Sequence, residues 1–242
     1  VYFLDSDDVP RAEALWRLTQ AAREKQLDMA KARFCFLNDE TGELTDGAAI
    51  YPTDVLAGGT LLAAQCQSGT YEPMVWQCVY RRAFLLENGL RMAEGLLFED
   101  ELFQAPALIR AKRAAAFDAV ILEYRQRPGS IMASFAGSAK WCASYAQVCA
   151  RLDALARTLP SGAARAALQR RVGQIALNVG KNIPAYRLPP TVAGEAMAFL
   201  KAHRWELARY ALKSGDAAIA AQGALLLLSP KLFVGMYRRV MP

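Results

Sequence analysis

The stretch that decides the fold is Val1–Pro10, VYFLDSDDVP. Four residues that favour β-strands are followed at once by three carboxylates around one serine, which predicts a buried strand that runs into a turn. In an α/β sheet, ligands bind just beyond the carboxyl ends of the strands, where this acidic cluster would lie. Asp5 and Asp7 alternate along an extended chain, so both side chains can point the same way. Two such carboxylates suit Mg²⁺ or Mn²⁺, above all when a substrate diphosphate supplies further oxygens.

The same residues also have an interpretation that needs no ligand. Asp and Ser ahead of an amphipathic stretch make a helix N-cap, and Pro10 fits a first helical turn. Short acidic motifs occur often without a function, so the cluster alone leaves both interpretations open. The rest of the chain has to decide between them.

Length and composition limit the class of protein. The chain has 242 residues, 54% of them hydrophobic and 21% charged, which is enough for one sizeable core or one domain with a smaller appendage. The five cysteines are odd in number and form no CxxC pair, which argues against a disulfide framework and a zinc site. We expect reduced, mostly buried thiols and a cytoplasmic protein, because no apolar run reaches the length of a membrane span and no signal peptide is visible.

Charge is unevenly spread along the chain. Residues 1–60 hold eleven acidic and six basic side chains, whereas residues 201–242 hold seven Lys/Arg and two Asp/Glu. The last stretch, Lys231–Arg239 (KLFVGMYRR), mixes apolar residues with three cations. This composition is typical of an interfacial helix on anionic lipid, and a docked terminal helix is the alternative.

Two stretches in the middle of the chain add candidate functional side chains. In Tyr71–Asn88, YEPMVWQCVYRRAFLLEN, Trp76 lies in a strand or packed core, and base rates favour a core residue over a ligand contact. In Glu94–Ile109, EGLLFEDELFQAPALI, Glu99 and Asp100 open an amphipathic helix. The helix dipole favours acidic residues in a first turn, which is the structural interpretation. The same position keeps a carboxylate ionised, as a general base requires.

A pair of arginines follows in Arg125–Met132, RQRPGSIM. Arg125 and Arg127 beside a Pro-Gly-Ser turn suit a phosphate-bearing ligand, although a surface hairpin with solvated arginines explains the stretch equally well. Beyond this point the chain has helical periodicity throughout. The expected helices are 138–158, 161–178, 191–203 and 216–227.

Taken in order, YFLDSDD, VWQCVYRRAFLLENGL, EGLLFEDELF and YRQRPGSIM resemble the second half of a family 2 glycosyltransferase with the GT-A fold. The resemblance covers about residues 1–133. It implies an α/β fold in which a partial GT-A (Rossmann-like) sheet with flanking helices is followed by an all-helical C-terminal region. We therefore expect two domains, residues 1–133 and 134–242. The family's N-terminal nucleotide-binding half has no counterpart, and Val1 falls inside a predicted strand, so we expect a fragment that is inactive alone.

The resemblance also implies roles on the donor side of the site. Asp5 and Asp7 would bind the divalent metal, Mg²⁺ or Mn²⁺, and the nucleotide-sugar, with Asp7 the first choice as a direct ligand and Asp8 a less certain one. Part of this chain would match the family's loop that closes near the diphosphate. Its residues are Arg125, Arg127 and Ser130.

On the acceptor side, the family's Glu-Asp pair supplies the base that deprotonates the acceptor hydroxyl. Carried over, this base is Asp100, with Glu99 beside it. Trp76 would form part of the acceptor-binding wall. An inverting transfer needs one such base and a means of stabilising the leaving diphosphate, which the metal and arginines supply.

The implied function is inverting, metal-dependent transfer of a sugar from a nucleotide-sugar to a glycan or lipid-linked acceptor in cell-surface polysaccharide synthesis, at the inner face of a membrane. The alternative is a non-catalytic relic or scaffold whose helical tail binds a protein or membrane partner. Nucleic-acid binding is disfavoured, because the basic tail has no recognised motif. The single histidine, His203, excludes most Ser/His and Cys/His catalytic devices.

Overall fold

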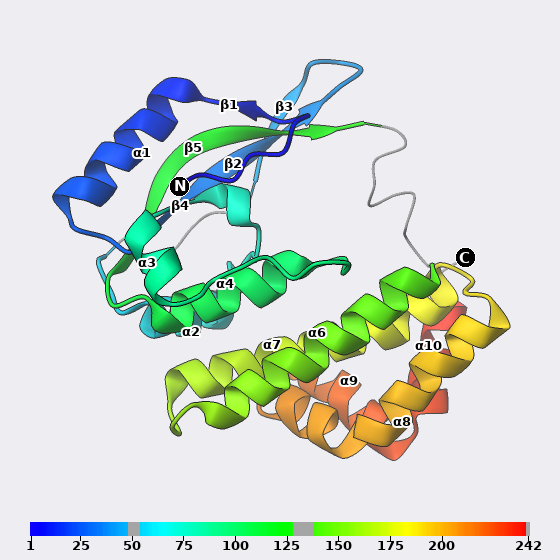
Figure 1. Cartoon of the computed structure of the whole chain (residues 1–242). Helices are drawn as coiled ribbons and strands as arrows, with labels where there is room; N and C mark the ends of the chain where they lie inside the picture. The colour runs from blue at the N-terminus through cyan, green and yellow to red at the C-terminus, as the bar shows by residue number, and fades with distance from the viewer. Residues whose placement is uncertain (48–53, 128–137, 241–242) are drawn as a thin grey trace. The chain divides into compact units, whose positions relative to one another are not determined.

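The computed structural model describes residues 1–47, 54–127 and 138–240 and divides the chain into two compact units (Figure 1). The sheet unit comprises Val1–Ala93 and Asp100–Ser130, and the helical unit comprises Glu94–Glu99 and Ile131–Pro242. The sheet unit holds a mixed sheet with flanking helices, and the helical unit follows it in the chain. The predicted fold class, a partial sheet with flanking helices followed by a helical C-terminal region, is confirmed.

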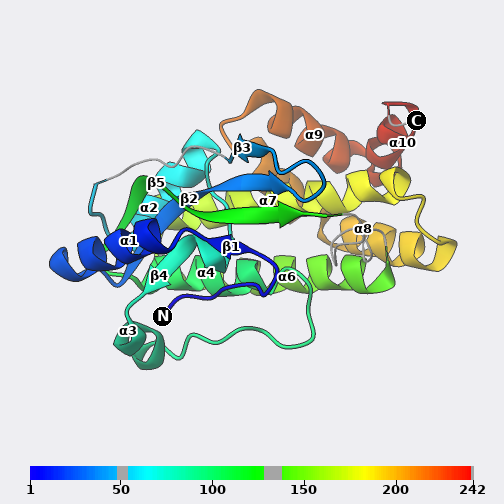
Figure 2. The same cartoon turned by 90° about the horizontal axis from the view of Figure 1, so that it is seen from above.

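Two long strands form the centre of the sheet. β2 (Met29–Asn38) and β5 (Ala114–Gln126) run parallel along the whole length of β2, and Figure 2 shows them side by side. β1 (Val9–Pro10) pairs antiparallel with β5, while β3 (Leu44–Asp46) and β4 (Cys78–Tyr80) pair antiparallel with β2. The first half of β2 is buried on both faces, as expected for a central parallel strand that is covered on both sides.

The helices of the sheet unit are α1 (Ala12–Glu24), α2 (Gly58–Ser68), α3 (Arg82–Glu87) and α4 (Glu99–Arg110, whose first residue falls in the helical unit), with a 3₁₀ turn η1 at Val75–Gln77. α1 packs on β2 and β5, and α2 packs on β5. In the view of Figure 1, α2 and α4 lie beneath the sheet. The first residue of α2, Gly58, has to be a glycine, because a Cβ atom there would lie 2.1 Å from the Leu108 carbonyl oxygen of α4.

The predicted buried strand over Val1–Leu4 is wrong. Val1 exchanges two backbone hydrogen bonds with Tyr80, of 2.7 and 2.9 Å, and Tyr2 forms an isolated bridge with Val79. The side chains of Val1 and Leu4 are 48% and 47% exposed. The apolar sequence does favour an extended chain. Among the described residues, however, it pairs only with β4, which is three residues long and too short to bury the whole segment.

The helical unit is built from five long helices, each of which packs against the next along the chain, while α10 also packs against α7. They are α6 (Ala139–Thr158), α7 (Ala163–Ala185), α8 (Pro190–Leu212), α9 (Ala217–Leu228) and α10 (Pro230–Val240). The four predicted helices are thus present, and Pro184 falls in the last turn of α7 instead of breaking it early. All five cysteines are buried, which agrees with the expected buried thiols. None of the described helices combines the length and hydropathy that crossing a membrane requires.

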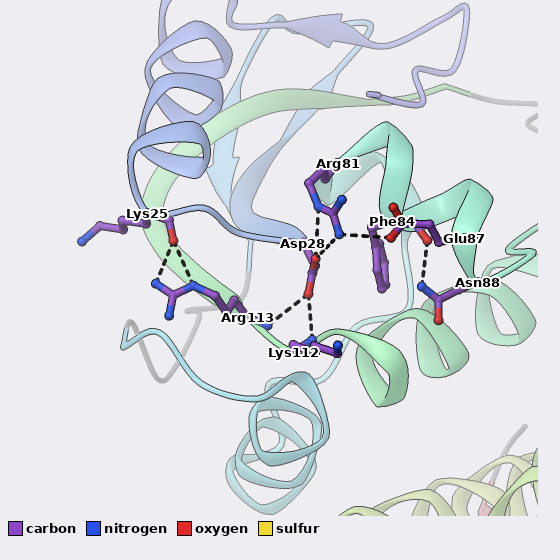
Figure 3. A network of polar contacts seen from close by, with 8 residues as sticks. All are labelled: Lys25, Asp28, Arg81, Phe84, Glu87, Asn88, Lys112 and Arg113. Carbon is purple, nitrogen blue, oxygen red and sulfur yellow. Dashed lines mark hydrogen bonds and ion pairs between the residues drawn. The ribbon is translucent and has the colours of Figure 1, made fainter.

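The buried carboxylate of Asp28 links three connecting segments of the sheet unit by hydrogen bonds (Figure 3). Asp28, just before β2, accepts hydrogen bonds from the Arg81 guanidinium at 2.8 Å and from the backbone N–H groups of Lys112 at 2.7 Å and Arg113 at 3.2 Å. The Arg113 guanidinium in turn donates to the Lys25 carbonyl at 2.8 Å. Burial alone would raise the pKa of Asp28, but these hydrogen bonds outweigh it and hold the pKa below its usual value.

We expect Asp28→Ala to lower the free energy of unfolding by about 3 kcal/mol, because it leaves the N–H groups of Lys112 and Arg113 and the Arg81 guanidinium without the Asp28 acceptor. Since the folded-state pKa is lowered, the stability from ionised Asp28 is present above the unfolded value of about 4 and is lost as pH falls through the folded value. Urea unfolding at pH 7 and pH 3 measures both effects. Glu13→Ala, which breaks the exposed Glu13–Arg17 pair, is the control and should cost under about 0.5 kcal/mol. Equal losses for the two variants would contradict the prediction.

Candidate functional site

The acidic cluster forms a turn between Leu4 and β1. The Asp8 N–H donates to the Asp5 carbonyl at 3.3 Å, so the segment is not extended and the alternation expected for Asp5 and Asp7 does not describe it. Asp5 is exposed, Asp7 is half-buried and Asp8 is only 9% exposed. The turn therefore places one carboxylate inside the unit and two closer to solvent.

The two predicted arginines meet this turn from the end of β5. The Arg125 N–H donates to Asp8 Oδ1 at 2.9 Å, and Arg125 Nε donates to the Asp7 carbonyl at 2.8 Å. Arg125 also pairs with Asp39, and Arg127 Nη2 lies 2.9 Å from Asp7 Oδ2. Side chains from opposite ends of the sheet unit's sequence are thus brought together at one point. Ser130, the third residue expected near the diphosphate, lies outside the described residues.

The electrostatics of the turn are dominated by negative charge. Burial raises the pKa of Asp8; the hydrogen bond from Arg125 partly offsets this, and the charges of Asp5 and Asp7 raise it further. Burial also raises the pKa of Tyr124, and the same three carboxylates add to that shift, Asp8 first. Asp8 Oδ2 is buried with no hydrogen-bond partner. A buried carboxylate oxygen without a donor, in a negative potential, is a feature that a bound cation would relieve.

A divalent ion at the acidic turn would need more ligands than the carboxylates of the turn supply. Among residues 1–47, 54–127 and 138–240, no group of three or more His, Cys, Asp or Glu side chains is placed to hold a metal by itself. Asp5 and Asp7 would therefore need additional oxygen ligands, which a donor diphosphate provides. The chemistry of the donors, hard oxygens only, suits Mg²⁺ or Mn²⁺.

Asp100 contacts the backbone just before Trp76. Its Oδ2 accepts a hydrogen bond of 3.4 Å from the Val75 N–H of η1. Trp76 is 5% exposed, stacks on Tyr124 with centroids 5.4 Å apart, and meets Phe34 edge-on at 4.9 Å. The indole is therefore a core residue by its contacts, and its role on the acceptor side stays a prediction.

The two acidic groups act on neighbouring side chains of β4 and its surroundings. Burial raises the pKa of the Cys78 thiol, and Asp100 is among the charges that raise it further. Burial also raises the pKa of Tyr2, which bridges to β4, and Asp8 adds to it. Asp100 and Asp8 thus each act electrostatically on a residue of β4 or on one that bridges to it. Glu99 is the first residue of α4 and is half-buried, and its role also stays a prediction.

Several residues of this site were missed by sequence reasoning. Tyr124, which stacks on Trp76 and whose pKa the carboxylates of the acidic turn help to raise, looks in sequence like any aromatic residue of a strand. Asp39, the partner of Arg125, lies in the turn after β2, where acidic residues are common. No spacing rule links it to an arginine 86 residues away.

With this geometry in hand, the comparisons with known proteins are informative. No family model matches the chain. A protein of Escherichia coli (strain K12), described as the uncharacterized glycosyltransferase YibD, is 30% identical over 129 residues, which is 51% of this chain and 37% of that protein. The crystal structure of S. aureus TarS 1-349 in complex with UDP-GlcNAc matches with a TM-score of 0.67 and 17% identity, over 100% of this chain and 66% of that chain. A second crystal structure of S. aureus TarS 1-349 matches with a TM-score of 0.64 and 15% identity, over 100% of this chain and 65% of that chain.

The chain has the fold of the TarS structures. Its similarity to YibD in sequence covers about half of this chain, and its similarity to TarS in fold covers all of it. The chain spans just under two thirds of the TarS structures, and the YibD match spans little more than a third of that protein.

Proposed function

We propose that this chain provides the metal-binding, diphosphate-binding and acceptor-activating groups of an inverting, metal-dependent family 2 glycosyltransferase. The reaction is transfer of a sugar from a nucleotide-sugar to a hydroxyl of a glycan or lipid-linked acceptor in cell-surface polysaccharide synthesis. The observation that carries the proposal is the meeting of Asp7 and Asp8 with Arg125 and Arg127 at one end of the sheet. The UDP-GlcNAc bound to TarS, whose fold this chain shares, supports a nucleotide-sugar donor.

On the donor side, Asp7 and Asp5 would hold Mg²⁺ or Mn²⁺, which when bound stabilises negative charge on the diphosphate leaving group. Arg127 is half exposed and pairs with Asp7, so its guanidinium can turn to a diphosphate that binds beside that carboxylate. Arg125 is held by two hydrogen bonds. Its backbone N–H donates to the Asp8 carboxylate, and its guanidinium donates to the Asp7 carbonyl. Its role is to fix the acidic turn and to supply fixed positive charge beside it.

On the acceptor side, Asp100 takes the proton of the acceptor hydroxyl while that oxygen bonds to the anomeric carbon and the bond to the diphosphate oxygen breaks. The hydrogen bond from the Val75 N–H orients the Asp100 carboxylate. Glu99 supplies the second acidic group of the pair. Trp76 is almost fully covered, so we propose that it shapes the acceptor wall by supporting the Tyr124 ring.

The proposal is tested by nucleoside diphosphate release from a panel of UDP-, GDP- and dTDP-sugars, with Mn²⁺ or Mg²⁺ and glycan acceptors, using the full-length enzyme. The expected result is release from donors of one nucleotide class, falling to background when EDTA is added. Release that persists at full rate in EDTA would overturn metal dependence. No release from any donor would overturn the transferase assignment.

The helical tail carries a surface that suits an anionic membrane, which would place the enzyme at the inner membrane face. α9, AAIAAQGALLLL, contains no charged residue, yet only Gly223 and Leu226 are buried. α10 is docked through Phe233, whose ring fits over Gly180, where a side chain would come within 2.4 Å of it. Other side chains at this end of the chain stay exposed, among them large apolar ones and cations. This α9–α10 surface consists of Leu228, Lys231, Leu232, Met236 and Arg238.

We expect the α9–α10 surface to bind vesicles of phosphatidylcholine with about a third phosphatidylglycerol, because apolar side chains beside cations suit an anionic interface. Leu232→Glu combined with Met236→Glu should lower the bound fraction about tenfold or more in a sedimentation assay. Leu86→Glu, at a similarly exposed leucine on α3, is the control and should bind like the wild type. Equal binding by both variants, or binding that ignores added salt, would contradict the proposal.

A further inference from the structure

Lys31 is a fully buried lysine in the middle of the sheet. It is the third residue of β2, and its backbone is flanked by Cys78 of β4 on one side and by Ala116 of β5 on the other. None of its surface is exposed. Removing an ammonium group from water costs far more free energy than burying an apolar side chain, so a buried lysine persists where its charge has close partners. The contacts of this ammonium group therefore indicate what it does.

The Lys31 ammonium group holds the segment between α2 and η1. Its Nζ donates to the Glu72 carbonyl at 2.5 Å and lies 5.6 Å from the centroid of the Tyr71 ring. The Glu72 side chain is held separately, because Gln77 Nε2 donates to its Oε2 at 2.7 Å. Gln77 is itself fully buried. Glu72 is thus anchored twice, by its backbone carbonyl and by its carboxylate.

The anchored segment carries the N–H group that binds the candidate base. Val75 follows Glu72 by three residues, and its N–H donates to Asp100 Oδ2 at 3.4 Å. The Tyr80 hydroxyl lies 3.5 Å from the Val75 carbonyl oxygen and donates to Gln104 Oε1 at 2.6 Å. Gln104 lies one turn after Asp100 in α4. The place of Val75 therefore bears on how the first turn of α4, and the carboxylate in it, is held.

Lys31 and Asp100 also act on one buried thiol. Burial raises the pKa of Cys78, the Lys31 charge lowers it, and the Asp100 charge raises it. Because the effect of a charge falls with distance, both groups lie near this side chain. The ammonium group and the candidate base are thus close to the same buried residue, and all three belong to the sheet unit.

We propose that Lys31 and Gln77 are positioning residues for the candidate base: they anchor Glu72 and so fix the Val75 N–H that orients Asp100. The inference rests on the proposed function, in which Asp100 takes the proton of the acceptor hydroxyl. Neither Lys31 nor Gln77 touches the reacting atoms. They act by keeping the segment from shifting, and small displacements of a catalytic group slow a reaction strongly.

The first test measures the anchoring by hydrogen exchange of the Val75 amide, followed by NMR in this 242-residue chain. Lys31→Met keeps the length of the side chain but removes the donor to the Glu72 carbonyl, and Gln77→Leu removes the donor to its carboxylate. Each should speed exchange of this amide about tenfold or more. Lys25→Met makes the same change at an exposed lysine of the same unit and should leave the amide unchanged.

Unchanged exchange in Lys31→Met would overturn the anchoring. Replacing a buried charge by an apolar side chain of similar volume is often tolerated, so this variant is expected to fold. Should it not fold, unchanged exchange in Gln77→Leu would overturn the anchoring instead.

The second test is a double-mutant cycle in the full-length enzyme. Lys31→Met should lower kcat about 10- to 100-fold with the donor KM unchanged, because the donor-side residues are not disturbed. Added to Asp100→Asn, it should lower the residual rate by less than about twofold, because an amide takes no proton wherever it lies. Lys25→Met should keep the wild-type rate in both backgrounds.

The cycle separates the positioning role from the proposed function. An equal loss from Lys31→Met in both backgrounds, or no loss in either while Asp100→Asn is inactive, overturns the positioning role alone. An Asp100→Asn variant as active as the wild type overturns the proposed base and with it the positioning role, whatever the exchange result.

Discussion

Asp100→Asn is expected to lower kcat by about 10²- to 10⁴-fold in the full-length enzyme while leaving the donor KM unchanged. The amide has the shape of the carboxylate, and its oxygen can still accept the hydrogen bond from the Val75 N–H. It cannot accept a proton from the acceptor hydroxyl, so the loss should fall on the chemical step. Initial rates over a range of donor and acceptor concentrations measure the split between kcat and KM.

Two further variants make this prediction specific. Glu94→Gln neutralises an exposed acid a few residues earlier in the same segment and should keep the wild-type rate within about twofold. Glu99→Gln tests the other member of the acidic pair, and a loss smaller than that of Asp100→Asn would identify Asp100 as the base. A scaffold protein would be indifferent to all three. An unchanged rate in Asp100→Asn, with correct folding shown by thermal melting, would therefore refute the catalytic role.

The sequence was informative about elements whose pattern repeats. Helical periodicity located the long helices from Ser138 onward, because burial of one face leaves a regular mark on a chain. The sequence misjudged Val1–Leu4, whose composition favours a β-strand. Whether a strand is buried depends on how many neighbours pair with it, and that number is not written in its own residues.

The candidate site, too, could be predicted only in part from the sequence. The residue types at the site could be foreseen, because carboxylates after an apolar run suit a divalent metal and arginines beside a Gly-Ser turn suit a phosphate ligand. Their pairing could not, since Arg125 meets Asp8 across 117 residues of chain. Nor could the burial of Asp8, because the turn that tucks it inward depends on a hydrogen bond to a distant strand. Motif order supplied the link that local patterns lacked.

Asp7→Asn is expected to lower kcat/KM by about 10²- to 10³-fold, the loss typical of removing one group that stabilises charge in a transition state. It should also abolish stabilisation by ligand. For the wild type, Mn²⁺ with nucleoside diphosphate at about 100 times its Kd should raise the free energy of unfolding by about 2.7 kcal/mol, because only the folded chain binds it. Thermal melting with and without the pair, and after EDTA, measures this effect independently of turnover.

The variant also removes the ion pair between Asp7 and Arg127, so a control must share that loss. Asp118→Asn does so, because Asp118 is exposed and pairs with Arg33 at 2.8 Å in the same sheet unit. If ligand-dependent stabilisation disappears in Asp7→Asn but survives in Asp118→Asn, the lost function is binding and not a surface ion pair. If Asp7→Asn still gains stability from Mn²⁺ and diphosphate, the cation lies elsewhere. The buried Oδ2 of Asp8, which has no hydrogen-bond partner, would then be stabilised only by the positive charge of the arginines and not by a cation.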